Sequence, residues 1–166
     1  MTAHTFGRRT AGRVAAAVLA AAVLAAMLGG VALAHESRDV GDYRFVVGFA
    51  VEPAFEGEKN GVSLRITDAD GEPVEGAEQS LQVEVVHADS GASRTTPLRA
   101  QFGAPGSYTA DLLPTASGVY AFRFFGTVGD LDVDETFTSG EGFNSVEPIT
   151  DIQFPDEVAS GREVQA

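Results

Sequence analysis

Three residues of this chain have the types and spacing of a metal site: His35, His87 and Asp89. If the chain is cut after Ala34, His35 becomes the first residue, and its free α-amine and imidazole Nδ1 can chelate one metal ion. The imidazole of His87 would complete a plane of three nitrogen ligands, which copper(II) prefers. Asp89 follows on the same face of an expected strand and could assist. These residues predict a copper(II) site that depends on cleavage after Ala34.

The first 34 residues have the pattern of a secretory signal peptide. Residues 1–13 contain three arginines and no acidic residue, and residues 14–34 carry no charge. The segment ends in the small-x-small sequence Ala-Leu-Ala, preceded by a Gly-Gly pair that favours an extended cut site. Residues 14–34 are also nearly long enough to span a bilayer, so an uncleaved membrane anchor is the alternative. The sequence predicts an exported protein, periplasmic or extracellular, with any membrane attachment confined to residues 14–34.

The charge of the remaining chain excludes several partners. Residues 35–166 contain 8 lysines and arginines against all 24 aspartates and glutamates, a net charge of −16. Such a segment does not bind nucleic acid, whose affinity comes from neutralising phosphates, and anionic lipid surfaces repel it. The absence of cysteine excludes a lipoprotein anchor, disulfides and thiolate metal sites. Both methionines precede the predicted cut, which excludes a thioether copper(I) site.

Alternating apolar and polar residues, separated by turn residues, predict short β-strands along residues 35–140. The clearest is VSLRIT at 62–67, where every second side chain is apolar. The other expected strands, one of them weak at 94–102, are 43–51, 81–87, 108–113, 119–125 and 131–138. About seven short strands at this spacing predict an all-β, antiparallel, immunoglobulin-like β-sandwich in one domain, preceded by the hydrophobic N-terminal segment.

Two segments are expected to lie outside the strands of the sandwich. Residues 35–42 are interpreted as an arm that reaches about 25 Å when extended, which would allow His35 to meet His87. Residues 141–166 lose the alternation and contain two prolines and many acidic residues. They predict a partly ordered acidic tail, with Phe143 and Phe154 packed on the sandwich.

The runs NGVSLRITDADGEPVEGA (60–77) and GSYTADLLPTASGVYAFRF (106–124) resemble the small exported YtkA-like and FixH-like domains of bacteria. The resemblance covers about two thirds of residues 35–166 and consists of strand and turn patterns. It implies an immunoglobulin-like fold and suggests cation or copper handling near respiratory oxidases. It carries over no catalytic residues.

Calcium is a second candidate metal, ranked below copper. Asp130, Asp132 and Asp134 alternate along an expected strand, and carboxylate oxygens suit calcium. Asp68-Ala69-Asp70-Gly71 resembles the opening of a calcium-binding loop, although the rest of that loop pattern does not follow. The favoured interpretation of the alternating aspartates is a solvated face that prevents pairing with other sheet edges.

No enzyme motif stands out in the chain. A serine triad would need His87 as its base, and neither a Gly-x-Ser-x-Gly element nor a phosphate-binding loop occurs. The sequence therefore predicts a non-enzymatic binding protein with two open alternatives. It binds and delivers copper(II) through His35, or it is an accessory module that presents a sheet face or edge to an envelope protein.

Overall fold

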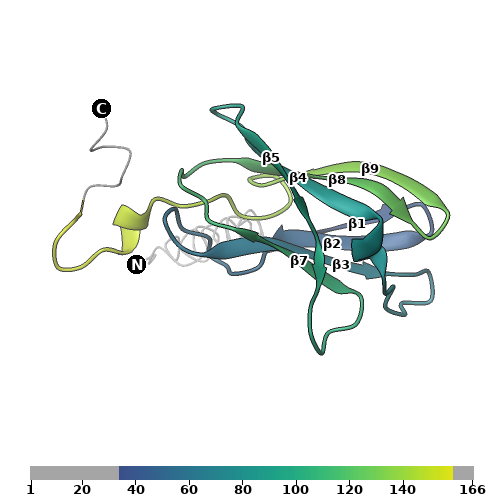
Figure 1. Ribbon diagram of the computed structural model, residues 1–166. Coiled ribbons are helices and arrows are strands. Elements are labelled where there is room, and N and C mark those ends of the chain that lie inside the picture. The colour runs from purple at the N-terminus through teal and green to yellow at the C-terminus, as the bar shows by residue number, and fades with distance from the viewer. Residues whose placement is uncertain (1–33, 159–166) are drawn as a thin grey trace, which may run out of the picture. The chain divides into compact units, whose positions relative to one another are not determined.

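The computed structural model describes residues 34–158, which form two antiparallel β-sheets packed face to face (Figure 1). The first sheet has the order β1-β2-β3-β7-β6 and the second the order β5-β4-β8-β9. The strands are β1 (His35–Val40), β2 (Tyr43–Phe49), β3 (Asn60–Thr67), β4 (Leu81–His87), β5 (Ser93–Pro97), β6 (Arg99–Ala100), β7 (Ser107–Leu112), β8 (Tyr120–Val128) and β9 (Leu131–Thr138). The predicted all-β, immunoglobulin-like sandwich is confirmed.

The helical segments of residues 34–158 are two short 3-10 turns, η1 (Ala77–Gln79) and η2 (Ile149–Ile152). Neither is long and apolar enough to cross a membrane. The apolar segment at 14–34, on which the anchor prediction depends, lies almost entirely outside the described residues.

The core forms where the alternating strands face one another. In β3, Val62, Leu64 and Ile66 are fully buried, while Arg65 between them is exposed. The same alternation in β4 buries its apolar residues against the phenylalanines of β8 and β9. Removing this apolar surface from water is the main term that holds the two sheets together.

The first strand was not anticipated. Residues 35–40 pair with β2 along their whole length, from His35 opposite Gly48 to Val40 opposite Tyr43, and do not form a free arm. Val40 is the single apolar residue of this strand, so hydrophobic alternation gave no signal. The pairing of β1 with β2 is set by the tight turn at Gly41, whose φ of +58° favours glycine.

The weak strand expected at 94–102 is two strands in different sheets. Residues up to Pro97 pair with β4 in the second sheet, and Arg99 and Ala100 pair with β7 in the first. Leu98 between them is buried in the core. The change of sheet places Leu98 in the core, where its apolar side chain is removed from water.

The segment after β9 contributes to the core over its first residues. The ring of Phe143 is buried, stacked on Phe122 with centroids 5.4 Å apart, and Val146 is buried beside it. Phe154, which was also expected to pack on the sandwich, is 93% exposed.

A carboxylate with buried oxygens, that of Glu52, lies close to this segment. Both oxygens of Glu52 are buried and have no hydrogen-bond partner of standard geometry among the described residues. Burial raises the pKa of Glu52 above its usual 4.5; contacts with the backbone of Phe49 and the side chain of Asn144 offset this in part, and the charge of Glu147 adds to it. The folded state therefore holds a proton on Glu52 more tightly than the unfolded chain does.

Glu52→Gln is expected to raise the free energy of unfolding at pH 7 by about 1 kcal/mol, since it removes a poorly solvated charge. Because the pKa of Glu52 is higher in the folded state, its ionisation lowers the free energy of unfolding at pH values above that pKa. The penalty disappears once Glu52 is protonated in both the folded and the unfolded state. The gain should therefore shrink as the pH falls to about 4. Urea unfolding of both proteins at pH 7 and pH 4 measures it. An equal difference at both pH values would contradict this explanation.

Candidate interaction site

His87 lies at the end of β4 with its side chain directed between the sheets and 7% exposed. Its Nε2 lies 3.1 Å from the carbonyl oxygen of Ser117, and its Nδ1 lies 2.8 Å from Oγ of Ser90. A carbonyl oxygen only accepts, so Nε2 carries the proton and donates to Ser117, and Nδ1 of the neutral ring accepts from the Ser90 hydroxyl. The ring also packs on Tyr120, with centroids 4.9 Å apart. Both nitrogens of His87 are therefore already bonded within the protein.

Asp89 approaches His87 across Gly118. A Cβ placed on Gly118 would lie 3.1 Å from Oδ2 of Asp89 and 3.5 Å from Nε2 of His87. Gly118 has a φ of +113°, a conformation that favours glycine. The structure thus brings together two of the three residues expected to bind copper(II).

His35 lies on a different face of the molecule. Its ring covers Gly48 on the outer side of the first sheet, in a shallow depression shared with Arg65. Phe49, next to Gly48, packs on Tyr120, which packs on His87, so the β2 backbone and two buried rings separate the imidazoles. Within residues 34–158, no three His, Cys, Asp or Glu side chains are arranged to bind a metal ion. The copper(II) site stays a prediction for protein with a free amine on His35.

Copper(II) titration of protein that begins at His35 is expected to give the same nitrogen couplings in electron paramagnetic resonance before and after His87→Ala. The reason is that His87 is bonded at both nitrogens and faces the interior. A matched protein with one extra residue before His35 reports the contribution of the amine alone. Loss of a nitrogen coupling in His87→Ala would contradict this expectation and would restore the site of His35, His87 and Asp89.

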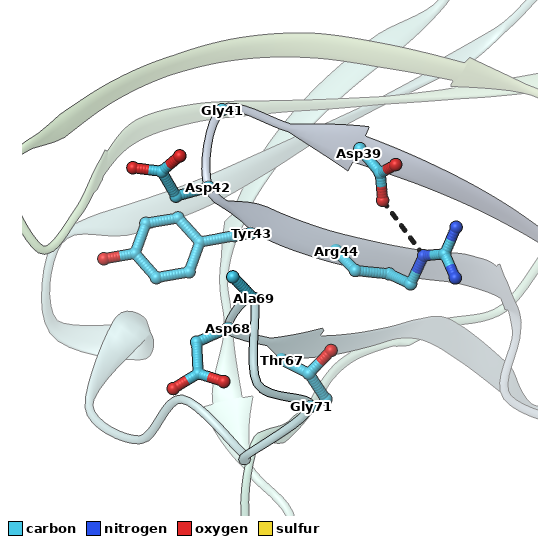
Figure 2. Close-up of a pocket in the computed structure, with 9 residues that line it drawn as sticks. All are labelled: Asp39, Gly41, Asp42, Tyr43, Arg44, Thr67, Asp68, Ala69 and Gly71. Carbon is cyan, nitrogen blue, oxygen red and sulfur yellow. Dashed lines mark hydrogen bonds and ion pairs between the residues drawn. The ribbon is translucent and has the colours of Figure 1, made fainter.

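In the turn expected to resemble a calcium-binding loop, the Asp68 carboxylate is hydrogen-bonded to backbone N–H groups of the turn itself. Oδ1 of Asp68 accepts hydrogen bonds from the N–H groups of Asp70 and Glu72, at 3.0 and 2.9 Å. Asp68 lines a depression of about 460 Å³. Figure 2 shows the lining residues, with the ion pair between Asp39 and Arg44 as a dashed line. The Asp68 carboxylate therefore stabilises the turn.

The alternating aspartates of β9 face solvent, as the favoured interpretation supposed. Asp132 and Asp134 are exposed, and Asp134 forms two hydrogen bonds with Arg123, at 2.6 and 2.7 Å. These hydrogen bonds and the charge of Arg123 lower the pKa of Asp134. Arg123 also contacts Glu84 at 3.4 Å, which adds a further cross-strand ion pair on this outer face.

Next to His87 lies an open cleft of about 300 Å³. Its lining includes His87 and Tyr120, Arg94 and Thr96 of β5, and Leu113 after β7. Its lining thus comes from β4, β5 and β8 of the second sheet and from β7 of the first, with the segment that follows it. Leu113 is 53% exposed there. The cleft thus combines an apolar wall with polar groups, as binding sites commonly do.

The edge of β5 beside this cleft has free backbone groups. The backbone N–H of His87 donates to the carbonyl oxygen of Ala92, so these two residues form a hydrogen-bonded pair. Every second pair along the β4–β5 ladder is then also hydrogen-bonded. By that alternation, the N–H and C=O of Arg94 and Thr96 point toward β4, and those of Ser93 and Thr95 point away from it. Because β5 is at the end of its sheet, the groups of Ser93 and Thr95 are open to another strand.

The other edges are less accessible. Arg38 of β1 lies 4.2 Å from the ring of Phe137 and donates to Glu135 of β9 at 3.1 Å, so it links the edges of the two sheets on that side. Glu36 also forms an ion pair with Arg38. Burial alone would lower the pKa of Arg38, but the two glutamates raise that pKa overall. The remaining edge strand, β6, has two residues. Among the described strands, β5 is the edge best placed to pair.

No known family model and no curated protein matches this chain. Among solved structures it is similar to a DUF4426 family protein from Pseudomonas aeruginosa PAO1, with a TM-score of 0.46 and 13% identity over 69% of this chain and 98% of that one. It is also similar to the Lin-41 filamin domain, with a TM-score of 0.39 and 12% identity over 61% of this chain and 90% of that one. Membership of the YtkA-like or FixH-like families stays an expectation.

Proposed function

We propose that this protein is an exported, non-enzymatic interaction module that binds an extended segment of an envelope protein along the edge of β5. The observation that supports this function is the free edge of β5 beside an open cleft. A strand added there would bond to the free groups of Ser93 and Thr95, and its inward side chains would enter the cleft. Backbone bonds supply affinity in this mode, and the cleft supplies specificity.

Two sequence features support the cellular setting of the proposal. The basic, apolar and small-x-small pattern of residues 1–34 is typical of export. The net charge of −16 over residues 35–166 favours solubility and disfavours nucleic acid and anionic membranes. Both features are compatible with a protein partner outside the cytoplasm.

Thr95→Pro is expected to weaken binding of an added strand, because it removes an outward N–H without breaking a bond to β4. The probe is a phage-displayed library of random heptapeptides, selected against the immobilised full-length protein. Peptides selected by the native protein should lose at least about tenfold in affinity for Thr95→Pro, the effect of one or two lost hydrogen bonds.

Thr136→Pro is the matched control. Ser139 N–H donates to the oxygen of Tyr120, so the alternation of the β8–β9 ladder directs the N–H of Thr136 outward at the opposite edge. Both variants change threonine to proline at an edge N–H, and only Thr95→Pro should affect binding. Equal affinity of the selected peptides for both variants, or failure to select any peptide, would overturn the proposed function.

A further inference from the structure

Arg94 is a charged residue on the core-facing side of its strand. It lies opposite Val85, which is buried between the sheets, so both side chains project from the same face of the second sheet. Unlike Val85, Arg94 is exposed, and it lines the cleft. Among residues 34–158 it has no carboxylate partner within ion-pair distance, unlike Arg38, Arg44 and Arg123, each of which binds an acidic side chain.

The one carboxylate that lines the cleft is already compensated. Oδ1 of Asp111 lies 2.9 Å from Arg99 and 3.9 Å from Lys59. Arg94 is therefore a local positive charge in a strongly acidic domain. Leu113, which lines the same cleft, presents an apolar side chain that is 53% exposed.

Resting on the proposed function, we infer that the bound segment carries an acidic side chain facing Arg94 and, on the same face of the segment, an apolar side chain facing Leu113. In a strand added to β5, residues two apart point the same way, so one strand can supply both. An opposite charge directly across two strands is favourable, and Leu113 gains by losing contact with water. The net charge of −16 over residues 35–166 disfavours acidic segments over most of the surface, so Arg94 favours this site and one register of the bound strand.

The first test compares heptapeptides selected by the full-length native protein with those selected by Arg94→Glu. The native protein should enrich an Asp or Glu two positions from an apolar residue, and Arg94→Glu should enrich Lys or Arg at that position. An Arg94 that only prevents edge-to-edge aggregation would produce no charge preference in either selection.

The second test measures affinities of one selected peptide and of its acidic-to-lysine counterpart for the native protein and for Arg94→Glu. The native protein should bind the acidic peptide about 2- to 5-fold more tightly than the lysine peptide, and Arg94→Glu should reverse the order. Leu113→Ser should weaken both peptides without changing the order.

The two proposals fail in different ways. Peptides that depend on Thr95 but show no charge reversal would overturn the acidic partner and leave the edge-binding function in place. Peptides that bind independently of Thr95 would overturn the function, and with it this inference.

Discussion

Phe143→Ala is expected to lower the free energy of unfolding by about 3–5 kcal/mol, the usual cost of removing a buried phenylalanine ring. The ring is 3% exposed and contacts two others, Phe122 at 5.4 Å and Phe49 at 5.7 Å between centroids. These rings come from different sheets, so Phe143 fills the space between the two sheets at this end. Neighbouring strands cannot close the cavity left by alanine. Urea unfolding followed by far-ultraviolet circular dichroism measures the loss.

Phe154→Ala serves as the matched control. It removes the same ring from a position that is 93% exposed, so the free energy of unfolding should change by less than about 0.5 kcal/mol. Similar losses in the two variants would contradict the placement of Phe143 in the core.

Gly126→Ala is expected to cost about 4 kcal/mol or more, or to prevent folding. Gly126 lies in β8 opposite Leu81, with a φ of +130° that side chains rarely adopt. A Cβ there would lie 2.1 Å from the carbonyl oxygen of Ser80, which is backbone and cannot rotate away. The variant combines a steric clash with backbone strain, so its cost should exceed either term alone.

Gly57→Ala separates the cost of backbone strain from the cost of the steric clash. Gly57 also has a positive φ, +79°, but a Cβ there would meet nothing within 4 Å. Its cost should be the backbone strain alone, about 1–2 kcal/mol. If Gly126→Ala proved no more destabilising than Gly57→Ala, the close approach of β8 to Ser80 would be wrong.

The sequence predicted the strands whose inner face is apolar. β3 and β4 alternate without interruption, and both ladders form where the pattern places them. β1 escaped prediction because an edge strand with one buried residue needs no apolar alternation. The split at Pro97 also escaped, since a single pattern over 94–102 cannot reveal that its two halves join different sheets.

The candidate site was predictable only in its local parts. His87 and Asp89 are two residues apart in sequence, and the structure brings them together around Gly118. Residues distant in sequence, such as Arg94 and Leu113, line the same cleft because of how the two sheets pack, which no local pattern encodes. The polar run SRTTP with its terminal proline is typical of an edge strand, and that signal could have identified β5 as a candidate surface.

Amide hydrogen exchange of the full-length protein, with and without a selected heptapeptide, tests edge pairing most directly. The account predicts slower exchange of the Ser93 and Thr95 amides when peptide is bound, because each gains an acceptor, with no change at Thr136 on the opposite edge. Unchanged exchange at Ser93 and Thr95 under saturating peptide, or protection at Thr136 in their place, would contradict binding along β5.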